Sequence, residues 1–407
     1  MKLHHHLISE IIAILGSIFV EGRYADKAVE ACFKTHIKWG ARDRKLFAET
    51  VYDIVRGWRW YWRLAGLPDE LCQEPDSISD LHLWHVWGAY WMSKTGAGID
   101  FHECADLTLE DIRQRGKGKI PPAIRYSVPD WLYELGATQL GAAWPDILAA
   151  LNQPADVYLR VNTLRLDAAG LVGQLAAENV ESEVVPGLPD AVRLPQRRNV
   201  FTTQAFKQGL FEVQDGSSQK VAPFLEAAPG QRVIDACAGA GGKTLHLASL
   251  MQNKGQIIAL DVHKWKLEEL RRRARRNGAH NIEARPIEDR TTIKRLHGKA
   301  DRVLLDVPCS GLGVLRRNPD AKWKLSTEEI SRLQELQQSI LVDYSRMVKP
   351  GGKLVYATCS ILPSENQNQV SAFLQTQGEN WKLEEELVLL PHQDGHDGFY
   401  AARLLRL

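Results

Sequence analysis

The amino-acid sequence predicts an α/β protein built from a helical region, a small α+β module and a doubly wound, mostly parallel sheet. Nine of the twelve tryptophans lie before residue 150, within runs whose apolar residues recur every three or four positions. Short β-prone runs begin at Val157, and after residue 215 apolar runs alternate with helical segments. That alternation is typical of parallel strands joined by helices. We therefore expect domains at residues 1–150, 151–225 and 226–407.

The first region predicts an all-helical domain. Apolar residues form one helical stripe from Leu7 to Phe19, and a second runs from Asp43 to Val55 and on to Trp62. Glycine and proline are sparse inside these runs. The aromatic residues and arginines of segment 56–63 allow two interpretations. They form either a surface that stacks on RNA bases or the core of a helix bundle with arginines at its rim, which we favour.

The remaining elements follow from shorter patterns. In the small module we expect strands at Val157–Val161, Ser182–Val185 and Ala191–Leu194, with a helix at Ala168–Glu178. In the last region we expect strands at Arg232–Ala236, Gln256–Leu260, Asn281–Ala284, Arg302–Leu305 and Lys353–Ala357. Helices are expected at Lys243–Met251, Lys264–Asn277, Thr327–Val348 and Pro363–Gln375. Two further strands, Leu383–Leu390 and Phe399–Leu404, close the sheet as a hairpin.

The composition is that of an ordinary globular protein. With 51 Lys plus Arg against 50 Asp plus Glu, the formal net charge is +1, which excludes a uniformly basic, histone-like binder. The apolar run Ile11–Val20 is half the length of about 20 residues that spans a membrane. The cysteines show no C-x-x-C spacing, so neither a disulfide framework nor a zinc site is expected, and a cytoplasmic location is predicted. They are Cys32, Cys72, Cys104, Cys237, Cys309 and Cys359.

A glycine-rich loop from Asp235 to Thr244 follows the first strand of the predicted sheet and precedes a helix. Its sequence, D-A-C-A-G-A-G-G-K-T, fits three cofactor classes unequally. A dinucleotide fingerprint needs a third glycine where Thr244 stands. A P-loop matches residues 237–244 except that Cys237 replaces its first glycine. In an S-adenosylmethionine loop, the glycines let the backbone approach the cofactor closely.

Acidic residues after the next two strands favour the third class. Asp261 ends the second strand, where a carboxylate can accept hydrogen bonds from both ribose hydroxyls. Asp289 follows the third strand, where it can meet an adenine amino group. A P-loop protein needs no acid at either place. Helix capping is the alternative interpretation of both residues, and for Asp289 the two interpretations stay balanced.

Two cysteines stand just past the ends of the fourth and fifth strands, Cys309 in D-V-P-C-S-G-L-G and Cys359 in Y-A-T-C-S. Ligands bind at this edge of a parallel sheet, so a chemical role is favoured over that of small buried apolar residues. Methylation at carbon 5 of a pyrimidine needs a thiolate to add at carbon 6, because carbon 5 is otherwise a weak nucleophile. The residues alone favour Cys309 as that thiolate, since pyrimidine methylases commonly present a Pro-Cys pair.

These motifs resemble the NOP/SUN family of RNA cytosine-5 methyltransferases, and within it the bacterial RsmB-like branch. The resemblance covers about residues 155–407. It is carried by Arg160–Arg165, Val213–Gln219, Cys237–Thr244, Asp306–Gly313, Thr358–Ser360 with Glu365-Asn366, and Asp397–Tyr400. The family's loop is usually C-A-A-P-G-G-K, whereas Gly239 and Ala240 stand at its third and fourth places here. These departures change the stiffness of the loop and remove no functional side chain.

The resemblance implies a class I (Rossmann-like) methyltransferase domain that uses S-adenosyl-L-methionine, preceded by a small α+β RNA-recognition-like extension. It implies that Cys359 is the nucleophile and that Cys309 aids product release, which reverses the choice made from the residues alone. Residues implied to hold the cofactor are Cys237, Ala238, Gly239, Ala240, Gly241, Gly242, Lys243, Asp261, Asp289 and Asp306. Asp306 is also a candidate contact of the target base, and no metal is expected.

RNA is the implied partner. Segment Asp43–Arg56 resembles the NusB-like domain of the RsmB-like branch, which favours small-subunit (16S) ribosomal RNA over transfer RNA as substrate. Basic residues gather in Lys264–Arg276, either for RNA or as a solvated face, and again at Arg316, Arg317, Lys322 and Lys324, the better candidates for phosphate contacts. We expect a monomer without a membrane partner. The alternatives are a transfer RNA methyltransferase, a P-loop NTPase and a non-catalytic ribosome-assembly factor.

Overall fold

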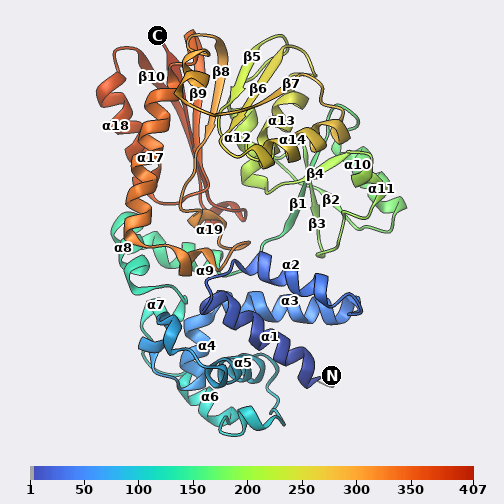
Figure 1. Ribbon diagram of the computed structural model, residues 1–407, viewed down its shortest axis with the longest axis vertical. Coiled ribbons are helices and arrows are strands. Elements are labelled where there is room, and N and C mark those ends of the chain that lie inside the picture. Colours follow the sequence, from blue (N-terminus) through green and yellow to red (C-terminus); the bar gives the residue numbers. More distant parts are fainter. Residues whose placement is uncertain (1–3) are drawn as a thin grey trace. The chain divides into compact units, whose positions relative to one another are not determined.

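The computed structural model describes residues 4–407, which form two compact units (Figure 1). One unit comprises Met1–Gln153 together with Leu315–Ser326, and the other comprises Pro154–Val314 together with Thr327–Leu407. We call them the helical unit and the catalytic unit. Within the described residues, no helix has the length and apolar character needed to cross a membrane.

The helical unit confirms the expected all-helical region. Its helices are α1 (His5–Phe19), α2 (Ala25–Thr35), α3 (Ala41–Arg56), α4 (Trp58–Ala65), α5 (Asp80–Thr95), α6 (Leu109–Arg115), α7 (Pro122–Arg125), α8 (Asp130–Leu140) and α9 (Trp144–Leu151). Trp58 and Trp62 of α4 are fully buried in one apolar cluster with residues of α1, α3 and α5. The aromatic cluster is therefore core, as favoured from the sequence, and not a surface for stacking RNA bases.

Arg59 of α4 shows how this core accepts a charge. Its side chain is almost fully buried and forms ion pairs with the carboxylates of Asp69 and Asp130, the second with an Nη1–Oδ1 distance of 2.8 Å. Its Nη1 also donates to the backbone carbonyl of Val128 at 2.9 Å. Two carboxylates and one backbone carbonyl thus accept the hydrogen bonds of the Arg59 guanidinium group. An arginine can be buried only when its charge and its N–H groups are paired in this way.

A segment from late in the sequence completes the helical unit. Helix α16 (Ala321–Lys324) packs the partly buried Trp323 against the apolar cluster, and its indole N–H donates to the backbone carbonyl of Val55 at 3.0 Å. The Lys322 ammonium is buried and donates to the carbonyl of Arg56 at 2.8 Å. Lys324 donates to the carbonyl of Ile18 at 3.4 Å, and burial lowers the pKa of both lysines. The expectation that Lys322 contacts phosphates is therefore wrong, whereas Lys324 is only partly buried.

The first part of the catalytic unit is a small antiparallel sheet with the strand order β2-β3-β1-β4. Its strands are β1 (Val157–Val161), β2 (Glu183–Val184), β3 (Ala191–Leu194) and β4 (Phe211–Val213), and its helices are α10 (Ala168–Ala177) and α11 (Gln204–Lys207). Strands β1 to β3 and α10 lie where the sequence places them. Strand β4 escapes the sequence pattern because it is only three residues long.

The main sheet has seven strands in the order β10-β11-β9-β8-β5-β6-β7. Its strands are β5 (Arg232–Asp235), β6 (Gln256–Asp261), β7 (Ile282–Pro286), β8 (Ala300–Asp306), β9 (Val348–Thr358), β10 (Trp381–Leu389) and β11 (Phe399–Arg406). Strands β5 to β9 pair in parallel, and β11 pairs antiparallel with both β9 and β10. This is the doubly wound sheet with a terminal hairpin that the sequence predicts.

Helices cover both faces of this sheet (Figure 1). On one face, α17 (Thr327–Ser345) and α18 (Gln367–Gln377) pack against alternate strand residues such as Ile234, Val303 and Tyr356. On the other face, α12 (Gly216–Phe224), α13 (Gly242–Leu250) and α14 (Lys264–Asn277) pack against their neighbours Val233, Leu304 and Val355. Because both faces are buried here, the central strands β5, β6 and β8 are largely apolar, whereas the edge strand β10 carries charged, exposed residues. Polar residues stand at the carboxyl ends of the strands. Two short helices follow strands closely in the sequence: α15 (Arg290–Lys294) comes after β7, and α19 (Pro391–Asp394) comes after β10.

Candidate active site

The candidate residues converge because five strands run in parallel. The carboxyl ends of β5, β6, β8 and β9 share one edge of the sheet, and the pairing aligns Asp306 of β8 with Ala357 of β9. Side chains that are far apart in the sequence therefore meet there. The strand order changes direction at β5 and β8, which is the point where such sheets bind ligands.

The glycine loop forms a tight turn between β5 and α13. Gly241 caps α13 with a φ of +88°, and a Cβ atom there would lie 2.6 Å from the side chain of Leu270. Only glycine meets both demands. At Gly239, by contrast, a Cβ atom would meet nothing within 4 Å. The loop thus packs closely against α14 at Gly241 and leaves open space at Gly239.

Asp261 supports this loop from the end of β6. Its carboxylate accepts the backbone N–H of Gly239 at 2.9 Å through one oxygen and that of His263 at 2.8 Å through the other. Helix α14 begins after His263 and has no side-chain cap, so the structure does not support the capping interpretation of Asp261. A carboxylate has about four acceptor positions, so two remain for a ligand's hydroxyl groups.

Asp289 lies at the N-terminus of α15 and acts as its cap. One of its oxygens accepts the backbone N–H of Thr291 at 2.8 Å and that of Thr292 at 3.3 Å. Hydrogen bonds with Thr291 lower the pKa of this exposed carboxyl. The sequence left helix capping and adenine binding balanced as interpretations of Asp289, and the structure shows the helix cap directly.

Cys237 differs from the other loop residues. Burial, followed by the nearby Asp235, raises the pKa of its thiol well above the ordinary value. Its side chain packs against the apolar cluster on the α17 face of the sheet. The thiol is therefore neutral, and Cys237 can serve a ligand only through its backbone.

Lys243 connects the glycine loop to the cysteines. Its ammonium lies 2.6 Å from the carboxylate of Asp306 at the end of β8 and 5.3 Å from the ring centre of Phe399. Burial opposes the charge, but Asp306 and then Cys359 attract it, so the pKa of Lys243 is raised. A permanent positive charge thus stands where β8 and β9 end.

The two cysteines at the ends of these strands meet directly. The sulfur atoms of Cys309 and Cys359 are 3.4 Å apart. The contact with Cys359 and then burial raise the pKa of Cys309 well above its ordinary value. Either cysteine can donate its S–H to the sulfur of the other across this distance.

A buried carboxylate holds both cysteine segments. Glu365 accepts the backbone N–H of Ser310 at 2.8 Å and hydrogen bonds from the hydroxyls of Ser310 and Ser360, the residues that follow the two cysteines. Gln337 of α17 donates to the same carboxylate at 3.0 Å and to the carbonyl of Pro308 at 2.9 Å. All of the about four acceptor positions of Glu365 are thereby used. Glu365 is the positioning residue that sequence motifs alone did not assign.

Backbone contacts complete this arrangement. Gly313 donates its N–H to the carbonyl of Cys359 at 2.9 Å and accepts from Gly398 at 2.8 Å. A Cβ atom on Gly313 would lie 2.1 Å from the carbonyl oxygen of Gly398, so the segment after Cys309 can approach this closely only as glycine. Asn366 donates to the carbonyl of Ser360 at 3.0 Å. The cysteine pair is thus preorganised by several independent contacts.

Comparison with known proteins decides the family. The family model described as 16S rRNA methyltransferase RsmB/F matches residues 222–405, and the RsmF/B-like ferredoxin-like domain matches residues 128–201. A probable ribosomal RNA small subunit methyltransferase B of Synechocystis sp. is 33% identical over 96% of this chain and 97% of its own length. The chain belongs to the RsmB/F family of 16S rRNA methyltransferases.

Other comparisons agree over 90% or more of the chain. Ribosomal RNA small subunit methyltransferase B of Pseudomonas syringae pv. tomato is 32% identical over 90% of both chains. The solved structure of PH0851 covers all of both chains, with a TM-score of 0.78 and 26% identity. The RsmB/F family methylates carbon 5 of cytosine in small-subunit ribosomal RNA, with S-adenosyl-L-methionine as methyl donor. This confirms the predicted enzyme class and excludes the P-loop alternative.

In this RsmB/F protein, some basic residues of helix α14 form buried ion pairs and others are exposed to solvent. Arg273 and Arg276 form ion pairs with the buried carboxylate of Glu212 on β4, at 2.9 Å for Arg273. Arg273 also donates to the carbonyl of Ala240 in the glycine loop at 2.8 Å. These arginines therefore join the small module to the loop, whereas Lys264 and Arg272 are largely exposed. The helix is only in part the solvated face that its composition suggests.

Proposed function

We propose that Cys359 is the nucleophile that activates the target cytosine and that Cys309 assists its release. The observation that carries this proposal is the 3.4 Å contact between the two sulfur atoms at the ends of β8 and β9. The raised pKa of Cys309 keeps the proton on that thiol, which suits a group that assists release, and Cys359 is the group that adds to carbon 6. The Lys243 ammonium lies where it attracts a negative charge on the Cys359 sulfur.

Each step has a group that suits it. Addition of Cys359 to carbon 6 makes carbon 5 an enamine carbon, and S-adenosyl-L-methionine supplies the methyl group that carbon 5 takes. The proton on carbon 5 then leaves to a basic group, and the bond between carbon 6 and the Cys359 sulfur breaks. The S–H of Cys309 can hydrogen-bond to the departing sulfur across 3.4 Å and so favour release.

The glycine loop and its supports fit the cofactor. The open space at Gly239 admits a ligand close to the backbone, and two acceptor positions of Asp261 remain for ribose hydroxyls. The other residues assigned to the cofactor are Cys237, Ala238, Ala240, Gly241 and Gly242, through their backbone, and Lys243, Asp289 and Asp306. Lys243 acts through Asp306, and Asp306 contacts the cofactor or the target base.

Covalent trapping tests the assignment of the two cysteines. RNA that carries 5-azacytidine keeps the adduct, because its ring position 5 cannot release a proton. We expect Cys359→Ala to abolish the trapped complex and Cys309→Ala to retain it, with Cys104→Ala as a control from the helical unit. Trapping by Cys359→Ala but not by Cys309→Ala would falsify the assignment.

The same proposal covers the domain limits and the setting of the reaction. We propose folding domains at 1–150, 151–225 and 226–407, with the segment Leu315–Ser326 contributed to the first. Free thiols at all six cysteines and a ribosomal RNA substrate support a cytoplasmic location. We propose that the protein acts as a monomer. Size-exclusion chromatography with light scattering tests this point.

A further inference from the structure

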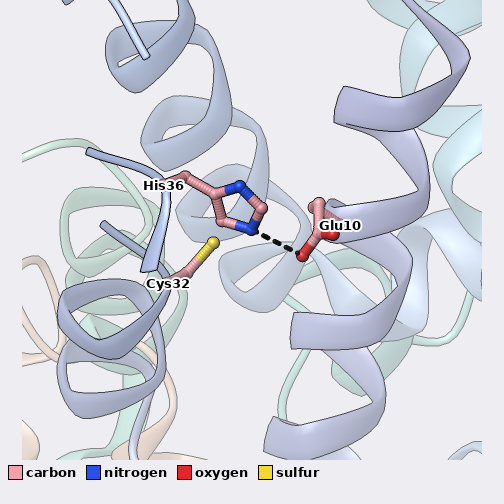
Figure 2. Close-up of side chains that lie close together, drawn as sticks. All are labelled: Glu10, Cys32 and His36. Carbon is pink, nitrogen blue, oxygen red and sulfur yellow. Dashed lines mark ion pairs between the residues drawn. The ribbon is translucent and has the colours of Figure 1, made fainter. Parts of the chain in front are cut away.

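Three potential metal ligands of different chemistry converge in the helical unit (Figure 2). Glu10 belongs to α1, Cys32 to the last turn of α2, and His36 is the residue at which α2 ends. One ligand atom from each lies within 4.8 Å of the others. We propose that Glu10, Cys32 and His36 bind a Zn²⁺ ion that joins α1 to the end of α2.

The spacing within α2 brings its two ligands to one side. Cys32 and His36 are four residues apart, and the backbone N–H of His36 donates to the carbonyl of Cys32 at 2.9 Å. Residues four apart on a helix share one face. His6 and Glu10 have the same spacing on α1, and the rings of His6 and His36 lie 6.0 Å apart between centres. His6 is therefore the nearby side chain for a fourth ligand position.

The distances suit a small tetrahedral ion. The Nε2 atom of His36 lies 3.3 Å from a carboxylate oxygen of Glu10. Ligand atoms at about 2.0 Å from a tetrahedral Zn²⁺ are about 3.3 Å apart. Zinc–sulfur bonds of about 2.3 Å place sulfur about 3.6 Å from the other ligands. Because the three ligand atoms already lie within 4.8 Å of one another, the Cys32 sulfur needs to approach by about 1 Å at most.

The surroundings hold the His36 ring in place. Trp39 stacks on it with ring centres 4.4 Å apart and planes inclined by 18°. Arg44 fixes the turn beneath by donating to the carbonyls of Phe33 and His36 at 3.3 Å and of Trp39 at 3.0 Å. A ligand that is oriented before the ion arrives loses less conformational freedom on binding.

The chemistry of the three groups selects zinc. Thiolate, imidazole and carboxylate are the protein ligands of Zn²⁺, whereas Mg²⁺ and Ca²⁺ prefer oxygen alone. Without an ion, burial and the Glu10 carboxylate raise the pKa of Cys32 to about 11. A cation at the centre of the cluster replaces this repulsion between negative groups with attraction, and binding then releases the thiol proton.

Cobalt and zinc titrations of the full chain, freed of metal by a chelator, test the site. We expect one equivalent of Co²⁺ to give a thiolate charge-transfer band and the visible bands of tetrahedral coordination. Zn²⁺ should displace Co²⁺ and raise the thermal unfolding midpoint. Cys32→Ser should abolish the charge-transfer band, and Glu10→Gln and His36→Ala should weaken zinc affinity at least about tenfold.

Cys104→Ser is the matched control, because Cys104 is a buried cysteine of the same unit. It should retain the band and the zinc affinity. Circular dichroism of each metal-free variant establishes that it is folded. A wild-type chain that binds no ion overturns the site, and so does a charge-transfer band that survives Cys32→Ser. Binding that depends only on His4 and His5 overturns it as well.

Discussion

The cysteines of the two units illustrate two ways in which a fold treats a thiol. In the helical unit, Cys72 and Cys104 are buried, and each sulfur faces an oxygen: the Asp69 carboxylate at 3.8 Å and the Trp84 carbonyl at 3.5 Å. Burial raises the pKa of each thiol to about 12. In the catalytic unit, Cys309 and Cys359 instead face one another at 3.4 Å.

A carboxylate stands near a cysteine in both units, but in different positions. In the helical unit, Asp69 pairs with Arg59 and faces Cys72, and burial followed by this carboxylate raises the pKa of that thiol. In the catalytic unit, the buried carboxylate of Glu365 binds the serines that follow the cysteines and leaves the sulfur atoms to each other. The first arrangement puts the carboxylate against the sulfur, and the second uses it to hold the two cysteine segments in place.

The largest expected difference is in thiol reactivity. With a pKa of about 12 for Cys72 and Cys104 against an ordinary value of about 8.5, their thiolate populations fall by about three orders of magnitude on folding. Alkylation followed by peptide mass spectrometry should show Cys359 modified in the folded chain. Cys72 and Cys104 should react only after denaturation. Equal rates at Cys72 before and after unfolding would contradict the comparison.

Removing the cation of the helical network should destabilise that unit. Arg59→Met leaves Asp69 and Asp130 without their partner, and we expect a loss of about 3 kcal/mol in the free energy of unfolding. This value allows for the partial exposure of both carboxylates. Chemical denaturation measures it, and Arg42→Met, at an exposed residue of the same unit, is the control. A loss no larger than that of the control would show that the pair contributes little.

Altering the carboxylate of the catalytic network should reduce turnover more than binding. In Glu365→Gln, an amide nitrogen replaces one of the oxygens that hold Ser310 and Ser360, so the two sulfur atoms lose their alignment. We expect kcat for methylation of small-subunit rRNA to fall about 100-fold, with little change in KM. Glu379→Gln, at an exposed position in the same unit, is the control. An unchanged kcat would remove Glu365 as a positioning residue.

The smallest expected effect concerns the buried carboxyl of Asp235. Burial raises the pKa of Asp235 from an ordinary 3.8 to about 7. Between these values the folded chain keeps a proton that the unfolded chain has lost, so this contribution to stability is present at low pH and is lost as pH rises. Asp235→Asn should remove about 2 kcal/mol of this pH dependence between about pH 5 and 7. Identical pH profiles of unfolding for both chains would contradict the shift.

Sequence patterns predicted the elements whose burial is periodic. The strands β5, β6, β8 and β9 were recoverable because both faces of the sheet are covered, which makes each strand a continuous apolar run. The positions of Cys309 and Cys359 followed from those strands. Strand β4 was not recoverable, because three residues carry no period.

Contacts between segments that are far apart in the chain could not be predicted from the sequence. Lys322 looks like a surface charge in the sequence, but the helical unit buries it, and α16 is too short to reveal an apolar face. The convergence of Cys32 and His36 with Glu10 could not be predicted from the sequence either. The three residues come from two helices, and their spacing is not the C-x-x-C spacing of common zinc sites. Glu365 stood in a motif, yet its role required the two serines to be seen together.

The place of Leu315–Ser326 in the helical unit affects how the protein is made. During synthesis the first 153 residues leave the ribosome early, but Trp323, which packs against their core, follows only after a further large part of the chain. The N-terminal unit therefore cannot finish folding in the order of translation. It must wait, with its tryptophan-rich interior incomplete, until most of the methyltransferase sheet has emerged, so the last step in maturing the first unit and the assembly of the second coincide in time.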